Sequence, residues 1–161
     1  MSVSQVSVFI ESRPGHLHAV LADFARAGVQ IRGYCASDTG DYGIVRFVVD
    51  KPDVAMRVLQ EAGAAAKRSE VLCLRLPDAP GELARVMGVI AERGVNVVYS
   101  YSLMNTFIAL SVEDLENAER LLSTAPVQLV SQADLAEPGI GVGARAGDAC
   151  ADEAHAGQEG R

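Results

Sequence analysis

The chain has 161 residues and a formal net charge of −7; 49% of its residues are hydrophobic and only 5% are aromatic. The excess of acidic residues and the lack of a basic run speak against a nucleic-acid partner, which requires clustered positive charge. Residues 1–5 lack the features of a signal peptide, and no apolar run approaches the roughly 20 residues that span a bilayer. Three irregularly spaced cysteines are typical of a reducing compartment. We therefore expect a cytoplasmic protein without a membrane partner.

The first half of the chain predicts the order βαββαβ. A Pro-Gly pair begins its first helix, whose apolar residues recur at i, i+3, i+4 and i+7, and Gly28 is expected to end that helix in a left-handed conformation. The expected elements, in chain order, are a strand at 6–10, a helix from 14, a strand at 31–37, a turn at 38–41, a strand at 43–49, a helix from 52 and a short strand at 65–67.

The second half predicts the same order again, because its loop and helix signals reappear 66 residues later. Ser-Arg-Pro-Gly at 12–15 returns as Asp-Ala-Pro-Gly at 78–81, and Gly-Val-Gln-Ile at 28–31 returns as Gly-Val-Asn-Val at 94–97. Such a repeat means that each copy is a complete supersecondary unit. The expected elements are strands at 71–76, 97–102, 106–111 and 127–130, and helices from 80 and over 113–122.

Two such units predict an α+β fold of two ferredoxin-like modules side by side, each with a four-stranded antiparallel sheet and two helices on one face. We place the modules at residues 3–68 and 69–136. Units of this size are marginally stable alone, so we expect them to pack on each other or on a second chain, as in a homodimer. Residues 137–161 are rich in Gly, Ala and acidic residues and predict a disordered tail.

The repeated motifs resemble those of tandem ACT-domain proteins, regulatory modules that bind amino acids. The resemblance rests on residues 11–15, 28–31, 78–83 and 94–97, and it covers roughly residues 3–135. The first copy, through Asp-Tyr-Gly-Ile-Val-Arg at 41–46, is also similar to the ACT domain of acetolactate synthase regulatory subunits. The family implies that ligands bind between two modules whose sheets are joined through their second strands.

The two Pro-Gly loops are the candidate ligand-binding elements, because free amides at a helix N-terminus attract a carboxylate. In the second loop, Asp78 offers an anion for a ligand ammonium beside the Gly81 amide, and Asn96 could bind the same amino acid. Plain helix initiation, with Ser12 and Asp78 as N-caps, is the alternative. Gln30 and Asn96 could equally be exposed turn residues. The full candidate set is Ser12, Arg13, Pro14, Gly15, Gln30, Ile31, Asp78, Ala79, Pro80, Gly81, Asn96, Val97 and Tyr99.

Other chemistry is not indicated. His16 and His18 are two residues apart on a helix and cannot share a metal ion. Cys35 and Cys73 fall in strands and are interpreted as small buried hydrophobes. Tyr99 and Tyr101 would share one strand face, as sheet packing or as the wall of a ligand site. No catalytic set and no cofactor motif are visible.

We therefore predict a non-catalytic regulatory protein that binds a free amino acid between its modules and modulates a metabolic enzyme. The alternative is a constitutive subunit of an amino-acid biosynthetic enzyme, similar to the acetolactate synthase regulatory subunit, that acts mainly through protein contact. Such a subunit would bind its enzyme without any amino acid.

Overall fold

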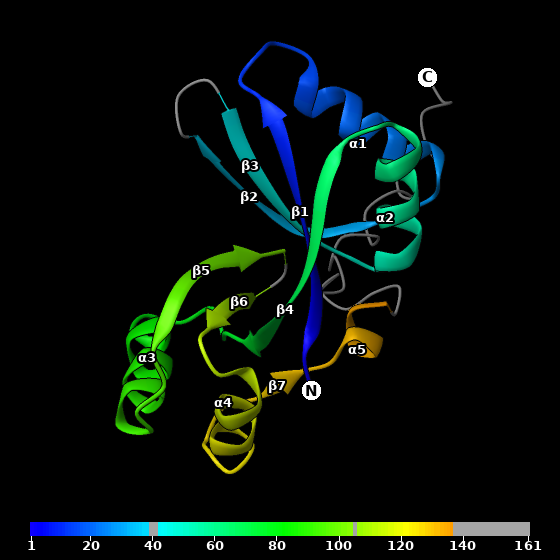
Figure 1. The fold of residues 1–161 in the computed structure, drawn as a ribbon. Coiled ribbons are helices and arrows are strands. Elements are labelled where there is room, and N and C mark those ends of the chain that lie inside the picture. The colour runs from blue at the N-terminus through cyan, green and yellow to red at the C-terminus, as the bar shows by residue number, and fades with distance from the viewer. Residues whose placement is uncertain (39–41, 105, 137–161) are drawn as a thin grey trace, which may run out of the picture.

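The computed structural model describes residues 1–38, 42–104 and 106–136 (Figure 1). The predicted turn at 38–41 falls mostly outside these residues, and so does the predicted disordered tail. The elements of the first half are β1 (Val3–Glu11), α1 (His16–Arg26), β2 (Ile31–Asp38), β3 (Tyr42–Val49) and α2 (Pro52–Glu61). Those that follow are β4 (Ala65–Arg75), α3 (Glu82–Glu92), β5 (Val97–Leu103), β6 (Phe107–Val112), α4 (Leu115–Leu122), β7 (Leu129–Val130) and α5 (Gln132–Ala136).

One strand, β4, belongs to both copies. The sequence predicts separate strands at 65–67 and 71–76, and this is wrong, because no Gly or Pro interrupts residues 65–75 and the strand runs through. Its beginning pairs with β1, where Val71 lies opposite Val3, and its end pairs with β6, where Leu72 lies opposite Leu110. In Figure 1, β4 passes from the upper half of the molecule to the lower half.

The described strands therefore form one antiparallel sheet with the order β2-β3-β1-β4-β6-β5, and β7 also pairs with β4. Each copy has the strand order of a ferredoxin-like fold: β1 lies between β3 and β4 in the first copy, and β4 lies between β6 and β7 in the second. The predicted fold class is therefore confirmed. The expectation that the second strands join the sheets is corrected, since the shared strand β4 joins them. The last strand is also shorter than predicted, and α5 was not predicted.

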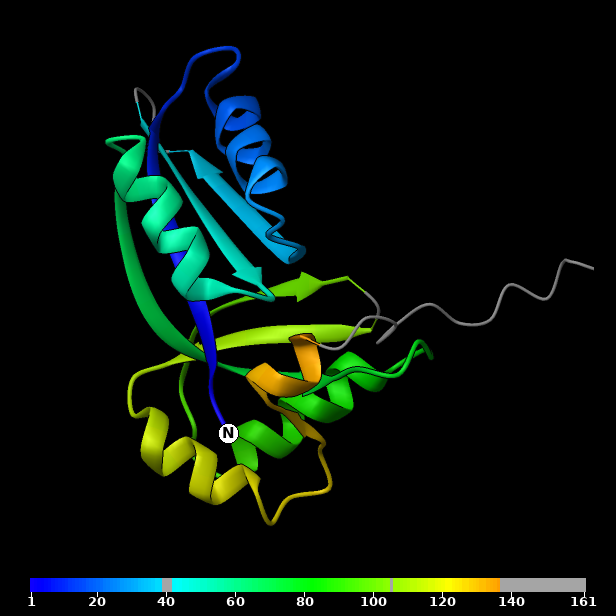
Figure 2. The same ribbon diagram turned by 90° about the vertical axis from the view of Figure 1, so that its right-hand side faces the viewer.

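Each copy has its own core between sheet and helices, and a third core lies between the copies. Val6, Phe24 and Phe47 belong to the first core, and Leu74 and Val86 to the second. The helix-free faces of the two halves of the sheet turn toward each other because the sheet is strongly curled (Figure 2). The third core fills this space and contains Val3, Val48, Val71, Cys73, Tyr101, Leu103, Phe107, Ala109, Val130 and Leu135.

The edge strands β2 and β5 meet at one end of this third core. The Met104 amide donates a hydrogen bond to the Arg32 carbonyl at 2.8 Å, and among the described residues this is the only backbone hydrogen bond between the two edges. A Cβ on Gly33 would lie 2.8 Å from the Leu103 Cα, so only glycine permits this approach. From this point the two strands diverge toward the left in Figure 1.

The C-terminal helix α5 ties the second copy back to the first. The Gln132 side chain accepts a hydrogen bond from the Ser4 amide (3.0 Å) and donates one to the Val49 carbonyl (2.8 Å). Leu135 is buried in the core between the copies. The contact between the copies is therefore made by a shared strand, the third core, an edge contact and a docked helix.

Candidate functional site

The two Pro-Gly loops have the same conformation. Gly15 (φ 90°) is the N-cap residue of α1, and Gly81 (φ 86°) is the N-cap residue of α3. Both glycines are left-handed, which explains why this position is glycine in both copies. No side chain caps either helix, so the interpretation of Ser12 and Asp78 as N-caps is wrong.

The second loop presents several polar groups without a partner among the described residues. The Asp78 carboxylate is exposed and has no hydrogen bond, and the Gly81 amide is likewise unbonded. The next amide, that of Glu82, donates to the Ala79 carbonyl at 3.2 Å and is therefore used within the turn. A carboxylate acceptor and an amide donor at a helix N-terminus are the groups that an α-amino acid requires.

Asp78 and Asn96 are not brought together within the second copy. They lie beyond opposite ends of α3, whose 11 residues extend about 16 Å. The Asn96 side chain instead donates to Glu113 at 3.3 Å. One amino acid is too short to bridge this distance, so the idea that both residues hold the same ligand does not fit the structure.

The residue before the second loop is linked to the start of β2 of the first copy through the β5–β6 hairpin. The Leu76 amide donates to the Thr106 carbonyl at 2.6 Å, which ties the loop to the β5–β6 hairpin. The hairpin is in turn bonded to the start of β2 through Met104 and Arg32. Gln30 directly precedes β2, and its backbone is held by Asp50, whose carboxylate accepts from the Gln30 amide at 2.7 Å. Gln30 and Ile31 therefore lie at the strand start to which the hairpin is bonded, and no hydrogen bond among the described residues joins them directly to the second loop.

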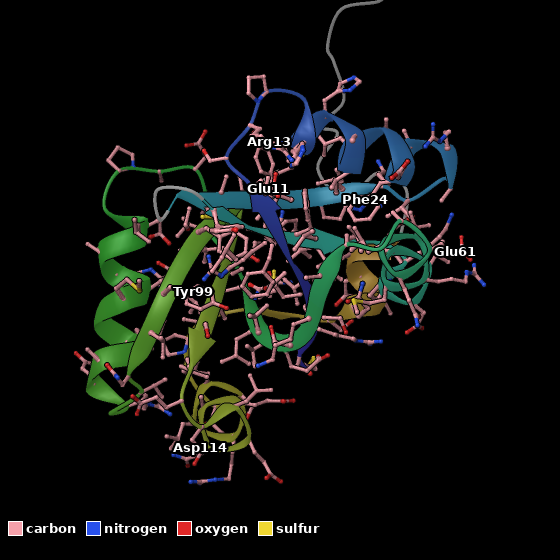
Figure 3. All side chains as sticks on the ribbon, turned by 45° about the horizontal axis from the view of Figure 1, so that its top comes forward. Glu11, Arg13, Phe24, Glu61, Tyr99 and Asp114 are labelled. Carbon is pink, nitrogen blue, oxygen red and sulfur yellow. The ribbon has the colours of Figure 1, made fainter. Side chains whose placement is uncertain are left out.

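The equivalent junction, between the first loop and the start of β5, is not formed by any hydrogen bond among the described residues. Ser12 is exposed, and Arg13 forms an ion pair with Glu11 of its own copy (Figure 3). Val97 packs on the core of the second copy. Within the described residues, backbone hydrogen bonds therefore connect the copies at the junction near the second loop and not at the junction near the first.

The sequence model of the protein family named ACT domain pair matches residues 1–138 of this chain. The chain belongs to this family. Protein BT0572 from Bacteroides thetaiotaomicron superposes with a TM-score of 0.80 at 28% identity, over 86% of this chain and 98% of that chain. The regulatory subunits of aspartate kinase from Thermus thermophilus (ligand-free form) and Thermus flavus have TM-scores of 0.57 and 0.53, at 19% and 17% identity. Both alignments cover 76% of this chain, with 90% and 92% of those chains. No curated protein sequence is significantly similar to this one.

A buried polar network links the two ACT modules, and Gln5 is at its centre. The Gln5 side chain is 1% exposed; it donates to the Tyr99 hydroxyl (2.8 Å) and accepts from the Tyr101 hydroxyl (2.8 Å). Tyr99 and Tyr101 share one face of β5, as predicted, and Figure 3 shows Tyr99 directed into the space between the modules. The Arg46 guanidinium lies 4.6 Å from the centre of the Tyr99 ring and donates to Ser37 at 3.2 Å.

In this network the pKa values of the two tyrosines shift in opposite directions. Burial acts to raise the pKa of Tyr99, but hydrogen bonds with Gln5, Ser111 and Arg46 and the positive charge of Arg46 outweigh it and lower that pKa below its usual value. Burial raises the pKa of Tyr101 well above its usual value, and burial also raises the pKa of the Cys73 thiol to about 12. The prediction that Cys73 is a buried hydrophobe is confirmed.

Sequence patterns did not reveal Gln5 and Arg46. Both are polar residues at inward positions of strands in which the outward neighbours Val6, Val45 and Phe47 are buried against helices. A polar residue in the inward register of a strand is the signal that could have indicated them, but only once two modules were known to face each other through their sheets.

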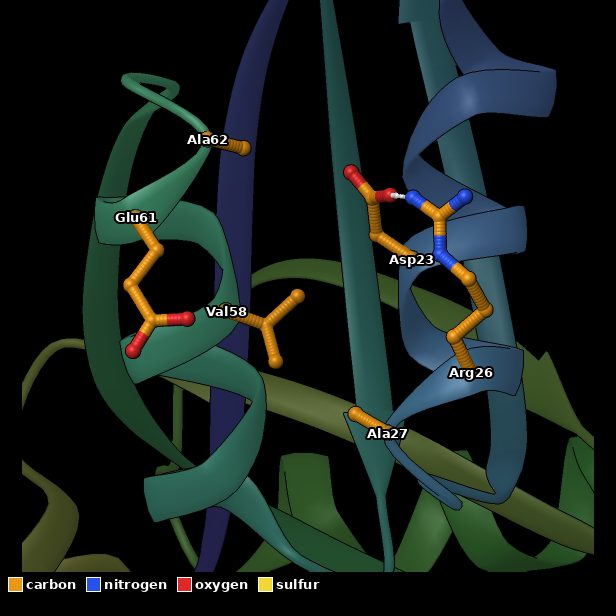
Figure 4. A pocket seen from close by; sticks show the side chains of 6 residues that line it. All are labelled: Asp23, Arg26, Ala27, Val58, Glu61 and Ala62. Carbon is orange, nitrogen blue, oxygen red and sulfur yellow. Dashed lines mark hydrogen bonds and ion pairs between the residues drawn. The ribbon is translucent and has the colours of Figure 1, made fainter.

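Two hollows lie away from this network. One, of about 400 Å³, lies between the C-terminal ends of α1 and α2, with Asp23, Arg26 and Glu61 at its rim (Figure 4). The other, of about 320 Å³, is beside the second loop and is lined by Arg75, Pro77, Arg85, Ala125, Pro126, Val127 and Gln128. The described residues contain no group of three or more metal-ligating side chains and no helix long and apolar enough to cross a membrane.

Proposed function

We propose that this ACT domain pair is a non-catalytic cytoplasmic regulatory protein that binds a small free amino acid between its modules. The observation that supports the proposal is the connected junction, in which the β5–β6 hairpin is bonded on one side to Leu76, just before the loop at 78–81, and on the other to Arg32 near the start of β2. Asp78 would bind the ligand ammonium, the Gly81 amide would bind its carboxylate, and Gln30 would contact either group. Ala79, Pro80 and Ile31 would form the wall.

The remaining candidates are divided between two places that no hydrogen bond among the described residues joins. Ser12, Arg13, Pro14 and Gly15 are presented by the first loop, and Asn96, Val97 and Tyr99 by the start of β5. Serine carries no charge where the second loop has Asp78, so the first loop binds an ammonium less well. We expect one strong site in each chain.

A ligand at the connected junction contacts both modules and therefore favours the arrangement in which they touch. The regulatory effect on a metabolic enzyme equals the difference in ligand affinity between the two arrangements. Regulatory subunits of aspartate kinase share the fold. Pull-down experiments with and without the amino acid would identify the enzyme that this chain regulates.

A thermal-shift screen against the twenty amino acids tests the proposal, because a ligand at 100 times its Kd stabilises the folded state by about 2.7 kcal/mol. Asp78→Ala should weaken binding of the amino acid found by about tenfold to a hundredfold, which corresponds to ~1.5–3 kcal/mol for a charge-assisted hydrogen bond. Ser12→Ala, at the equivalent position of the first loop, is the matched control and should change binding far less.

Two results would count against the proposal. If Asp78→Ala binds as tightly as the parent, the ligand is elsewhere. If no amino acid stabilises the protein while a partner enzyme binds it constitutively, the chain is a contact subunit. Melting the unliganded variants shows whether any loss reflects folding instead of binding.

A further inference from the structure

The helix-free face of the first module carries a row of polar residues that the second module does not cover completely. The pairing of β2, β3, β1 and β4 places Cys35 opposite Arg46, Arg46 opposite Ser7, and Ser7 opposite Lys67. All four side chains lie on the face opposite to the helices, because their neighbours in each strand face the helices. The row thus contains two cations on either side of a serine.

The same row in the second module is apolar and closed. Its equivalents, in the same strand order, are Tyr101, Ala109, Cys73 and Val130. None of these is more than 9% exposed, whereas in the first module Ser7 is also 9% exposed but Arg46 is half-buried and Lys67 is exposed. The charges of the first module are therefore not required by the fold, since the repeat of the same fold fills these positions with apolar side chains.

Neither cation has a carboxylate partner among the described residues. Arg46 is half-buried, donates to Ser37 and interacts with Tyr99, and Lys67 is exposed without a hydrogen bond or ion pair. A partly desolvated guanidinium without an anion is unfavourable, and its remaining donors suit a carboxylate. Between them, the Ser7 hydroxyl accepts from Gln5 at 3.3 Å, so its own proton remains available for donation.

An apolar strip lies directly beside this row. Two residues further along the strands, Ile44 lies opposite Phe9 on the same face. Phe9 is 47% exposed, and Tyr42, two residues before Ile44, is 60% exposed. Exposed aromatic side chains next to unpaired cations form an amphipathic surface on which an organic anion can place its charge and its hydrocarbon part at once.

We propose that Arg46, Ser7 and Lys67 bind the carboxylate of a small aliphatic or aromatic acid, whose hydrocarbon part lies over Phe9 and Ile44. Neighbouring strands are about 4.8 Å apart, so the side chains of Arg46 and Lys67 can both reach an anion above Ser7. This site is separate from the junction at Asp78 and does not depend on the function proposed for it. Because Arg46 lies over Tyr99 of the second module, an acid bound here contacts the boundary between the modules.

Titration of the full chain with hexanoate, followed by amide chemical shifts, tests this site, with acetate and 1-hexanol as probes that lack the tail and the charge. Hexanoate should shift the amides of residues 7, 46 and 67 and bind more tightly than either reference. Arg46→Met should weaken hexanoate binding by about tenfold or more, because charge-assisted hydrogen bonds are lost, whereas Arg46→Lys should have an intermediate effect. Phe9→Ser should weaken binding of hexanoate and leave that of acetate unchanged.

Arg57→Met is the matched control, since Arg57 is an exposed arginine of α2 on the helix side of the same module. It should bind hexanoate like the parent, and so should Asp78→Ala, which separates this site from the amino-acid site. The proposal is overturned if hexanoate shifts none of the three amides. It is equally overturned if folded Arg46→Met or Arg46→Lys protein binds as the parent does, or if 1-hexanol binds as well as hexanoate.

Discussion

The two ends of the contact between β2 and β5 are occupied by equivalent residues of the repeat, and they behave differently. Both strands have a bulge at the same place, between Ile31 and Gly33 in β2 and between Val97 and Tyr99 in β5. After the bulge, the first module has glycine and the second has tyrosine. Gly33 lets the backbone of Leu103 approach closely, whereas Tyr99 fills the other end with its ring and with Arg46 stacked on it.

This difference is one physical source of the asymmetry between the two ends. Where the residue has no side chain, the edges meet and the junction with the second loop is connected. Where the residue is large, the edges stay apart and the polar row of the first module remains partly open. A duplicated fold can therefore carry one closed and one open junction, although both copies keep the same elements. Truncations and substitutions can break or support this asymmetry.

Separating the modules should have the greatest effect. Residues 1–68 and 69–137, expressed alone, should each lack a cooperative unfolding transition, because each half loses part of β4 and exposes its side of the core between the modules. A longer fragment of residues 1–75, which keeps all of β4, should fare no better, because Val3 and Val48 stay uncovered. Thermal unfolding by circular dichroism tests this; a cooperative melt of a monomeric half would show that the modules are independent.

Gly33→Ala should destabilise the protein by about 1–3 kcal/mol, because the new methyl group would meet the Leu103 backbone and force the edges apart. Gly88→Ala is the matched control: Gly88 is an exposed residue inside α3 with no atom within 4 Å of an added Cβ. That variant should be stabilised by about 0.5–1 kcal/mol, the ordinary gain of alanine over glycine in a helix. Urea unfolding measures both, and equal effects would mean that the approach at Gly33 has no special role.

Periodicity and turn chemistry were enough to predict the helices and most strands, because local signals decide them. Pro14 and Pro80 lie in the turns just before the helices, which begin at His16 and Glu82, two residues later than predicted. Gly28 ends its helix in a left-handed conformation, as predicted, and Gly94 has the same conformation after α3. The continuity of β4 could not be predicted from local signals, since nothing in residues 65–75 tells one strand from two. It depends on long-range pairing with β1 on one part and β6 on the other.

The candidate site was predictable in its parts but not in its combination. Both Pro-Gly loops and both strand starts were identified from the repeat. Their combination was not, because α3 lies between the second loop and the strand start of the same copy, so that Asp78 and Asn96 are far apart. The polar groups around Gln5 were missed because only the packing of the two modules brings them together.

The alkaline stability of the chain should depend on Cys73, which occupies the position that Ser7 has in the first module. The folded state holds the pKa of Cys73 at about 12, against an ordinary value of 9.0. This stabilisation is complete below pH 9 and is lost as the pH rises through about 12, by up to about 1.4 kcal/mol per pH unit. In the Cys73→Ala variant the free energy of unfolding should decrease less between pH 9 and 10 than in the parent. In the Cys35→Ala variant it should decrease as in the parent. Urea unfolding at several pH values measures the slope, and identical slopes would exclude this role for Cys73.

The smallest difference concerns the second helix of each module. In α4 the Asp114 side chain accepts a hydrogen bond from the Asn117 amide at 3.0 Å, whereas the equivalent N-cap of α2 is Lys51, which makes no such bond. Asp114→Ala should cost about 1 kcal/mol of stability, because one helix amide loses its partner and the favourable charge near the N-terminus is removed. Lys51→Ala removes a hydrogen bond from an exposed ammonium to the Gly28 carbonyl. This loss should lower the stability by only about a few tenths of a kcal/mol. Urea unfolding of the two alanine variants at neutral pH gives the comparison, and an equal loss for both would mean that the cap on α4 adds nothing that α2 lacks.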